Sequence, residues 1–409
     1  MTTPRPNLLV VGASGNVARA FLRRLGGQRC HFGELVLLDK NQRVLTAPHL
    51  DHQRLDYRFL RRHLSLPRDQ RWFARLLQKH RIQMVLDVST HPTLPILSAV
   101  NAAAASYINT SLNDDRLEVG DLVRRLYPRR DQPRRAPHIL CSGMNPGVVN
   151  MLVCHGIEHF GKPRQIVHFE LDTSTPVNGW RPIVTWSKHE FLTETVWNHT
   201  GQFNGQSLQR YPGNALEHRE PLGGWIRPIG GVDHCPDAFV VLHEENLTVG
   251  RAFGVPSRFL YAIHPRTMRH LAARHRQQGT VFPHDLEQAD NVAERLDGTD
   301  LVGVCLDYPQ QRVYYINQLP NAAVLGASAT CAQVAVGIFA ALFTLLYERL
   351  PPRLYFVEDL YNTLYKRFVF ANLRIERFVC IRRKGRWIIR EHIPELRIRA
   401  PRDNAPAAL

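Results

Sequence analysis

The stretch that decides the fold is residues 8–18, with the sequence LLVVGASGNVA. Its four apolar residues predict a short buried strand, which ends at Gly12 in a tight turn. A helical stretch around residues 20–22 follows, so a strand, a glycine turn and a helix amino terminus come in succession. Free N–H groups and the helix dipole at such a turn bind a pyrophosphate. The residues expected to bind this group are Gly12, Ser14, Gly15, Asn16 and Val17.

The glycine spacing, GxxGxxA, is a weak signal by itself, and its context strengthens it. A second apolar strand, residues 34–38, ends in Asp39. A carboxylate at that position accepts hydrogen bonds from the ribose hydroxyls and repels a 2′-phosphate, and therefore selects NAD over NADP. Lys40 and Arg43 follow closely and can weaken this preference. The alternative is that Asp39 only ends its strand.

Two further strands extend the same pattern. Residues 82–86 lead to Asp87 and Ser89, and residues 106–110 end at Thr110 after an alanine-rich helix. Strands that alternate with helices predict a parallel, doubly wound sheet. We therefore expect an α/β protein with an amino-terminal Rossmann-type domain that holds NAD, and we expect Asp87, Ser89 and Thr110 to line the cofactor site.

Length and composition fit a soluble protein of two domains. The chain has 409 residues, of which 44% are hydrophobic and 22% are charged, and two domains that share a cleft are typical of this size. The longest apolar stretch, residues 334–346, contains Gly337 and is shorter than the roughly 20 residues needed to span a bilayer. It predicts a buried helix. The first residues lack the apolar segment of a secretory signal, and we expect a cytoplasmic protein that does not contact a membrane.

The seven cysteines are scattered singly, with no CxxC pair and no metal-ligand spacing. Such a pattern is typical of reduced structural cysteines. We therefore expect no metal site.

The formal net charge of +16 is unusual for a cytosolic enzyme and is compatible with an acidic partner or nucleic acid. Much of it is local, because residues 366–402 contain twelve Lys or Arg against three Glu. There the basic residues alternate with apolar ones, which predicts basic strands with one solvated face. No nucleic-acid-binding module accompanies the charge, so we favour a solvated surface over a nucleic-acid interface.

The second half of the chain contains the motif GMNPGV at residues 143–148, between an apolar run and an amphipathic helix of about residues 149–160. This motif resembles the signature of the saccharopine dehydrogenase superfamily, and more narrowly of the bacterial homospermidine synthases. The resemblance continues in the same order over roughly residues 7–350. Further residues that match the pattern are Glu170, Asp172, Trp186, Ser187, Glu194, His243, Glu245 and Asn321.

The resemblance implies a fold and a chemistry. Homospermidine synthases pair a Rossmann-type domain with an α+β substrate domain, form homodimers, and hold an NAD that is reduced and reoxidised within one turnover. An aminobutyl group passes from putrescine to a second amine to give a triamine, without net redox change. For this chain it implies an NAD-dependent enzyme of polyamine biosynthesis with a small amine as substrate.

The resemblance also implies roles for single residues. Trp186 would present a cation–π face to the ammonium, an interaction of about 1 to 2 kcal/mol when desolvated. His243 would assist proton transfer, and Asn145, next to Pro146, would orient the substrate or the nicotinamide. Glu170, Glu194 and Glu245 would be carboxylates around the amines, one of them a proton shuttle if burial raises its pKa. The residues expected to contact the substrate are Asn113, Asp114, Trp186, Glu194, Glu245 and Asn321.

The chain departs from the family pattern at residues 113–115, which read Asn-Asp-Asp where homospermidine synthases carry a Glu. A carboxylate that binds a distal ammonium is therefore an amide here. Either Asp114 or Asp115 replaces it, or the substrate differs at that end. From the residues alone, Trp186 is also explained as a core residue and Glu194 as part of a surface helix.

Two alternative functions remain open. A saccharopine- or carboxynorspermidine-dehydrogenase-like coupling of an amine with an aldehyde or keto acid would use Arg side chains as carboxylate clamps, and Arg181, Arg227 and Arg251 are candidates. A protein that binds NAD without catalysis is the alternative of another class, because a fold can persist without its reaction.

We expect four segments along the chain. Residues 1–146 form the NAD-binding domain and residues 147–320 the substrate and dimerisation domain. Residues 321–350 form a helix that returns to the domain junction, and residues 351–409 form a basic carboxyl-terminal extension.

Overall fold

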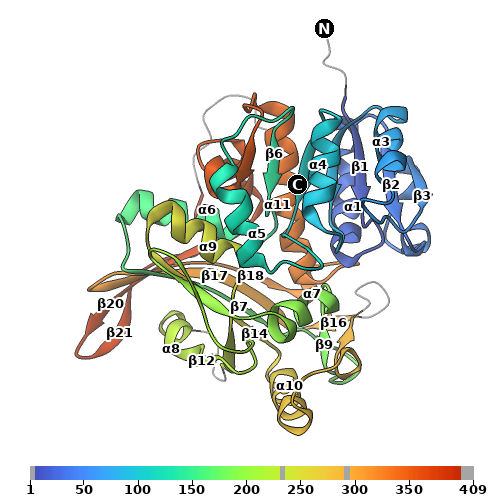
Figure 1. Cartoon of the computed structure of the whole chain (residues 1–409). Coiled ribbons are helices and arrows are strands. Elements are labelled where there is room, and N and C mark those ends of the chain that lie inside the picture. Colours follow the sequence, from blue (N-terminus) through green and yellow to red (C-terminus); the bar gives the residue numbers. More distant parts are fainter. Residues whose placement is uncertain (1–4, 231–234, 290–294, 398–409) are drawn as a thin grey trace.

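The computed structural model describes residues 5–230, 235–289 and 295–397, which form two sheets, one above the other in Figure 1. The first sheet has seven parallel strands, which confirms the predicted Rossmann-type α/β architecture. In spatial order they are β19 (Leu354–Phe356), β6 (His138–Leu140), β5 (Ser106–Asn109), β4 (Ile82–Asp87), β1 (Asn7–Val11), β2 (Leu35–Asp39) and β3 (Tyr57–Arg61).

Both faces of the first sheet are covered because its strands are apolar on both sides. Along β1, Leu8 and Val10 pack into one core cluster, whereas Leu9 and Val11 pack into another. The first cluster contains side chains of α1 (Asn16–Gln28), α2 (His52–Leu55), α11 (Ala329–Tyr347) and α12 (Leu364–Asn372). The second contains side chains of α3 (Gln70–Lys79), α4 (Thr93–Ala102) and α5 (Val119–Leu126). The sheet is therefore doubly wound, as predicted.

The second sheet has ten strands and is mixed, with β14 and β7 parallel and the other described pairs antiparallel. Its main path is β11 (Leu208–Arg210), β10 (Gly201–Asn204), β14 (Pro256–Ile263), β7 (Gln165–Asp172), β17 (Thr299–Asp307), β18 (Gln311–Pro320), β20 (Ile375–Arg383) and β21 (Arg386–Ile393), with β13 (Asp237–Val241) and β12 (Arg219–Pro221) attached at β14. Two short pairs join β8 (Thr175–Pro176) to β16 (Leu296–Asp297) and β9 (Ile183–Val184) to β15 (Glu287–Gln288). The second domain is thus α+β, as expected.

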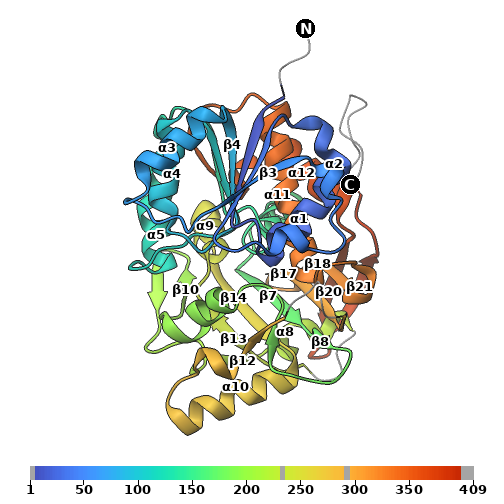
Figure 2. The same cartoon turned by 90° about the vertical axis from the view of Figure 1, so that its right-hand side faces the viewer.

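Helices α6 (Val148–Phe160) and α9 (Glu244–Phe253) lie between the two sheets, as Figures 1 and 2 both show. The second domain also contains α7 (Lys188–Leu192), α8 (Gly223–Ile226) and α10 (Pro265–Gln278). Strand alternation decides which side chains meet the first domain. Along β7, Val167, Phe169 and Leu171 pack into the core on the far side, so His168 and Glu170 face the first domain.

The predicted buried helix is α11, and the structure confirms its burial. It is long and apolar enough to cross a membrane, but 83% of its most apolar 18 residues is buried inside the fold. Its side chains pack with those of α1 and α12 in the core of the first domain.

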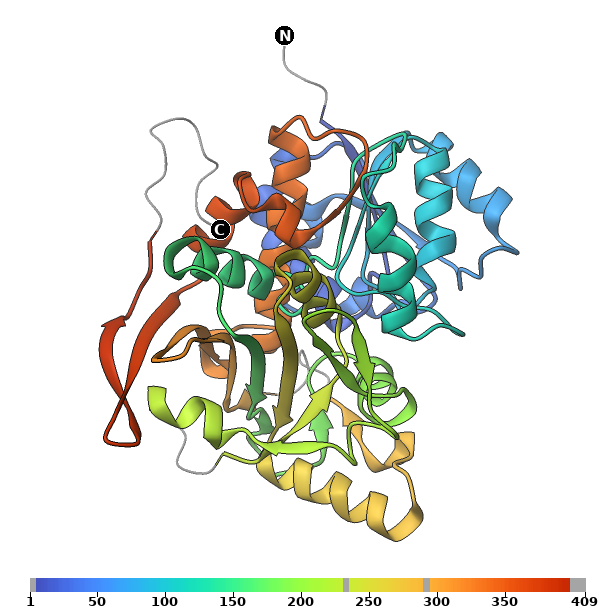
Figure 3. The ribbon, with the colours of Figure 1, turned by 60° about the vertical axis from the view of Figure 1, so that its left-hand side comes forward.

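The structure corrects the predicted carboxyl-terminal extension. Residues 351–397 belong to both sheets: β19 pairs with β6, and β20 pairs with β18. The cause is burial, because Leu354 and Phe356 are fully enclosed in the first domain. The basic residues gather at the exposed hairpin of β20 and β21, drawn in red at the side of the molecule in Figure 3. Residues 398–409 lie outside the described residues.

Candidate active site

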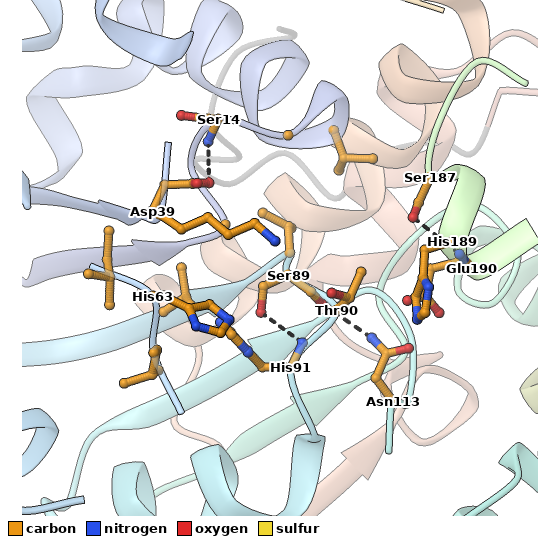
Figure 4. Close-up of a pocket in the computed structure, with 18 of the residues that line it drawn as sticks. Ser14, Asp39, His63, Ser89, Thr90, His91, Asn113, Ser187, His189 and Glu190 are labelled. Carbon is orange, nitrogen blue, oxygen red and sulfur yellow. Dashed lines mark hydrogen bonds between the residues drawn. The ribbon is translucent and has the colours of Figure 1, made fainter. Parts of the chain in front are cut away.

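A cavity of 810 Å³ opens at the carboxyl ends of β1, β2, β4 and β5, where parallel sheets of this type bind ligands. We call it the groove, and Figure 4 shows part of its wall. The residues predicted to bind the cofactor that line the groove are Gly12, Ser14, Gly15, Asn16, Val17, Asp39, Ser89 and Thr110. The structure therefore brings together residues up to about 100 positions apart.

The turn after β1 requires a glycine at residue 12. Gly12 has a φ of 81°, and a Cβ atom there would lie 2.9 Å from the Cα atom of Ser89. Two turns thus touch at the groove floor. Gly15 caps α1 without a side-chain hydrogen bond, so the first N–H groups of this helix remain available to an anion.

Asp39 lies where β2 ends, and both of its carboxylate oxygens face backbone N–H groups. Oδ2 accepts a hydrogen bond of 2.9 Å from Ser14 N, and Oδ1 accepts one of 2.9 Å from Asn41 N. Figure 4 shows the contact with Ser14. These bonds hold the carboxylate at the groove wall, which basic residues share: Lys40, Arg43, Arg62, His63 and His91.

Asn16 joins the two domains. Its Nδ2 atom donates to the backbone oxygens of Thr185 and Ala289, both at 3.0 Å. The side chain of Asn16 is therefore committed to the second domain, and only its backbone N–H is left for a ligand.

Asp87 is a correction to the prediction. Its carboxylate accepts hydrogen bonds from Tyr107 Oη at 2.8 Å and Ser89 Oγ at 2.6 Å. It is buried and lines none of the three cavities described here. Asp87 therefore positions Ser89 and does not itself contact a groove ligand.

A smaller cavity of 80 Å³, which we call the inner pocket, adjoins the groove; Val17, Thr110, Ser111 and Trp186 line both. The predicted residues in its wall are Asn145, Pro146, Glu170, Trp186, Glu194 and His243. The aromatic rings of Phe259 and Tyr261 complete the wall. The wall thus combines aromatic rings with the carboxyl groups of Glu170 and Glu194.

Neighbouring side chains fix the positions of the polar groups. Trp186 Nε1 donates a hydrogen bond of 3.0 Å to Tyr261 Oη, which holds the indole at the junction of groove and inner pocket. Asn145 Nδ2 donates to Glu170 Oε2. Burial raises the pKa of Glu170 to about 8, against the opposing effect of that hydrogen bond.

His243 lies among three carboxylates. Its Nε2 is 3.4 Å from Glu194 Oε1, and its Nδ1 is 3.2 Å from Glu244 Oε2 and hydrogen-bonded to Glu245 Oε2. Burial alone would lower the pKa of His243, but Glu245, Glu194 and Glu244 outweigh it and hold this pKa well above its ordinary value. The imidazole is therefore an imidazolium that links the inner pocket to the acids behind it.

Glu245 is placed differently from the prediction. It is fully buried behind His243 and lines none of the three cavities. Burial opposes its ionisation, but His243 lowers its pKa below the ordinary value. Glu245 thus holds His243 and raises the pKa of its imidazole, and it faces none of the three cavities.

Asn321 is a second correction. Its amide donates to Ser174 Oγ at 2.7 Å and to the backbone oxygen of Asp297 at 3.0 Å, and accepts from Ala329 N at 2.9 Å. It lines none of the three cavities. Asn321 therefore anchors the start of α11.

A third cavity of 310 Å³ lies beside the inner pocket, and we call it the outer pocket. Glu194 and His243 line both pockets. The predicted residues Asn113 and Asp114 line the outer pocket, but the Asp114 carboxylate accepts from Arg116 N at 2.8 Å and Leu117 N at 3.0 Å and so holds its own turn. Further acids in this wall are Asp115, Glu190 and Glu244.

The sequence predictions named neither Glu190 nor Glu244 as a site residue. Burial raises the pKa of Glu190 to about 8 and that of Glu244 to about 7. A signal for Glu190 exists, because it lies four residues before Glu194 on a predicted helix, and residues four apart share a face. Tyr261 carries no such signal, since it lies in the middle of an apolar strand.

The three arginines considered as carboxylate clamps lie elsewhere. Arg181, Arg227 and Arg251 line none of the three cavities, and Arg181 pairs with Glu287 at 2.9 Å. In the part of the chain that the structure describes, the inner-pocket wall contains no Arg or Lys.

This arrangement of two domains has a counterpart among solved structures. The fold is similar to that of homospermidine synthase. The homospermidine synthase of Legionella pneumophila, solved in complex with NAD, superposes with a TM-score of 0.70 at 14% identity, over 90% of this chain and 88% of that one. An amine dehydrogenase of Mycobacterium smegmatis covers 87% of this chain and 96% of its own at 9% identity. Its TM-score of 0.40 is too low to support a conclusion about this chain. No protein-family model matches the sequence, and no curated protein matches it.

Proposed function

We propose that this protein is an NAD-dependent enzyme that transfers an aminobutyl group between amines, with putrescine as donor, a triamine as product and no net redox change. The observation that carries the proposal is the inner pocket: Trp186, Glu170 and Glu194 surround a space that opens directly on the dinucleotide-type groove. The likeness of fold to homospermidine synthase supports the same assignment.

The groove fits NAD by its own chemistry. The floor at Gly12 leaves no room for a Cβ atom, the uncapped start of α1 provides N–H groups for a pyrophosphate, and Asp39 at the end of β2 provides a ribose acceptor. Gly15, Asp39 and Thr110 would hold the cofactor. Bound NAD supplies the hydride acceptor for amine oxidation and the hydride donor for the closing reduction.

The inner pocket would bind a cationic amine in a fixed orientation. Trp186 offers its ring face to the ammonium or iminium, and its hydrogen bond to Tyr261 keeps that face in place. Glu170 accepts a hydrogen bond from Asn145, and its second oxygen, Oε1, has no hydrogen-bond partner among the residues that the structure describes. An ammonium group at Oε1 would satisfy this buried atom and favour its ionised form.

His243 and Glu194 would handle the protons. In the proposed cycle the diamine loses hydride to give an imine, a second amine adds to that carbon, ammonia leaves, and hydride returns to the new imine. The adding amine must lose a proton and the leaving ammonia must gain one. Glu194 lies in the wall beside His243 Nε2, so the pair can accept the first proton and return it to the leaving nitrogen.

The charge of the wall argues against a keto-acid substrate. Glu170 and Glu194 line the inner pocket, and no described Arg or Lys does. The imidazolium of His243 in this wall already faces three carboxylates, so the carboxylate of a keto acid would find no free cationic clamp. The presence of Glu170, Trp186, Glu194 and His243 around one space argues against an NAD-binding protein without catalysis.

Product analysis tests the proposal. The purified protein, incubated with NAD and 1,4-diaminobutane, should form a triamine detected by mass spectrometry, with no accumulation of NADH. A Glu194→Gln variant that still binds NAD should lose this activity. Net NADH formation would point to a dehydrogenase, and NAD binding without turnover of any amine would contradict the proposal.

A further inference from the structure

The chain lacks the first-domain carboxylate that the family pattern places at residue 113, and the structure offers another from the opposite domain. Asn113 and Glu190 line both the groove and the outer pocket. Figure 4 shows their side chains extending into the same part of the cavity, Asn113 from the loop after β5 and Glu190 from α7. An acid at residue 190 thus reaches the space that an acid at residue 113 would occupy.

Glu190 differs from Glu194, Glu244 and Asp114, three other acids of the outer pocket, in having no side-chain partner among the described residues. Glu244 accepts a hydrogen bond of 2.6 Å from Leu112 N and lies against His243, and Glu194 pairs with His243. Asp114 holds its own turn. The carboxylate of Glu190 makes no hydrogen bond or ion pair within the described residues.

The backbone around Glu190 is held in place while its side chain is left open. Ser187 caps α7 by accepting a hydrogen bond of 3.3 Å from Glu190 N, and Trp186, which precedes this cap, lines the inner pocket. Glu190 is therefore carried by the same short segment as the predicted cation–π residue. Two cationic nitrogens of one substrate could therefore contact this segment, one at Trp186 and the other at Glu190.

We propose that Glu190 binds the second ammonium of the substrate and thereby selects diamines and longer polyamines over monoamines. This inference rests on the proposed function, which supplies the amine in the inner pocket. The first nitrogen lies near Trp186 and Glu170, and the chain of the substrate passes Glu194 into the outer pocket, where Glu190 receives the second nitrogen.

The free-energy cost of a carboxyl group without a partner favours a ligand beside Glu190. Burial, with Glu194 and Glu244 nearby, raises the pKa of Glu190 to about 8. Glu190 is half-buried and its carboxyl group has no partner among the described residues, and a cation beside it would offset the cost of this position. Asp115, the remaining acid of the outer pocket, is exposed to water and can bind a cation only weakly because solvent screens it.

The test compares two ligands that differ by one ammonium group. Calorimetry on the NAD-loaded protein measures the affinity for 1,4-diaminobutane and for 1-aminobutane. In Glu190→Gln, which keeps the shape of the side chain, the affinity for the diamine should fall about tenfold or more, while the affinity for the monoamine should change less than twofold.

Two further variants complete the test. Asp115→Asn is the matched control and should leave both affinities within about twofold. Asn113→Glu, added to Glu190→Gln, should restore the diamine affinity, because it returns a carboxylate to the same space. Equal loss for both ligands in Glu190→Gln, no loss for either, or a larger loss in Asp115→Asn would overturn the inference alone. A wild-type protein that binds no amine would overturn the proposed function together with it.

Discussion

At the scale of single residues, the site is a group of acids whose charge depends on what they face. Glu245, next to the imidazolium of His243, is ionised, whereas burial raises the pKa of Glu170 and of Glu190 to about 8. At neutral pH the carboxyl groups of Glu170 and Glu190 are therefore mainly protonated as long as no cation lies beside them. The same residue type is therefore ionised beside the imidazolium and neutral where no cation lies beside it.

This difference predicts that amine binding releases protons. A bound ammonium lowers the pKa of a neighbouring carboxyl, so between pH 6 and 8 binding converts a neutral acid to a carboxylate, and affinity should rise with pH until about 8. Calorimetry in buffers of different ionisation enthalpy measures the number of protons released. Glu170→Gln should release fewer protons than wild type; the same number in both would mean that Glu170 does not face the amine.

We expect Asp39 to determine the choice of cofactor. Asp39→Ala should weaken NAD binding about tenfold to hundredfold, because a hydrogen bond to a charged group contributes roughly 1.5 to 3 kcal/mol. Fluorescence titration with NADH and NADPH measures it, and affinity for NADPH should fall less because the repulsion of its 2′-phosphate is removed. His91→Ala, in the same groove wall, is the control for a general disturbance. Unchanged NADH affinity would mean that Asp39 only ends β2.

At the scale of elements, α6 connects the two sheets through one close approach. A Cβ atom on Gly156 would lie 2.2 Å from Leu306 Cδ1 and 2.9 Å from Tyr315 Cε2, so the helix packs directly on β17 and β18. The same helix begins right after the 143–147 turn that carries Asn145. Its seating therefore sets the position of a wall of the inner pocket.

Gly156→Val should lower the free energy of unfolding by about 1 to 3 kcal/mol, the usual effect of overpacking. Gly26→Ala is the matched control in α1, where a Cβ atom would meet nothing within 4 Å, and it should raise stability by roughly 0.5 to 1 kcal/mol. Urea unfolding of both variants checks the pair. Equal stability of Gly156→Val and wild type would contradict the tight packing of α6.

At the scale of the whole molecule, basic residues lie at the surface, whereas acidic residues line the two pockets. The chain carries a net charge of +16, and its basic hairpin, β20 and β21, lies at the exposed edge of the second sheet. Carboxylates line the two pockets where an amine would bind. Salt screens the surface charge beyond about 8 to 10 Å, so a cation in a pocket responds mainly to the acids around it.

Local patterns predicted the parts of the fold that are local. The run of residues 8–18 and the alternation of apolar strands with helices predicted the doubly wound sheet, because each strand and its turn are continuous in sequence. Strand β19 escaped prediction because it is three residues long and joins the sheet from far along the chain. The segment after residue 350 was predicted as an extension for the same reason, because its strands pair with β6 and β18, which lie far from it in the sequence.

The sequence predicted which residues lie at the candidate site better than it predicted what each of them contacts. The resemblance to homospermidine synthases singled out Glu245 and Asn321, but a sequence pattern does not show which way a side chain faces, and neither residue lines a cavity. The sequence likewise did not show that Tyr107, on the neighbouring strand, donates a hydrogen bond to the carboxylate of Asp87. The helical spacing of Glu190 and Glu194 was a signal that the predictions missed, and the structure adds that Glu190 and Asn113 line the same cavities.

The central claim is that hydride leaves the donor amine and returns to the product within one site. The most direct measurement uses 1,4-diaminobutane with both hydrogens on each nitrogen-bearing carbon replaced by deuterium, incubated with the protein, NAD and excess unlabelled NADH. We predict a triamine that retains all the deuterium of its aminobutyl units, as read by mass spectrometry. A triamine that has lost one deuterium at the transferred carbon, or deuterium recovered in free NADH, would contradict the account.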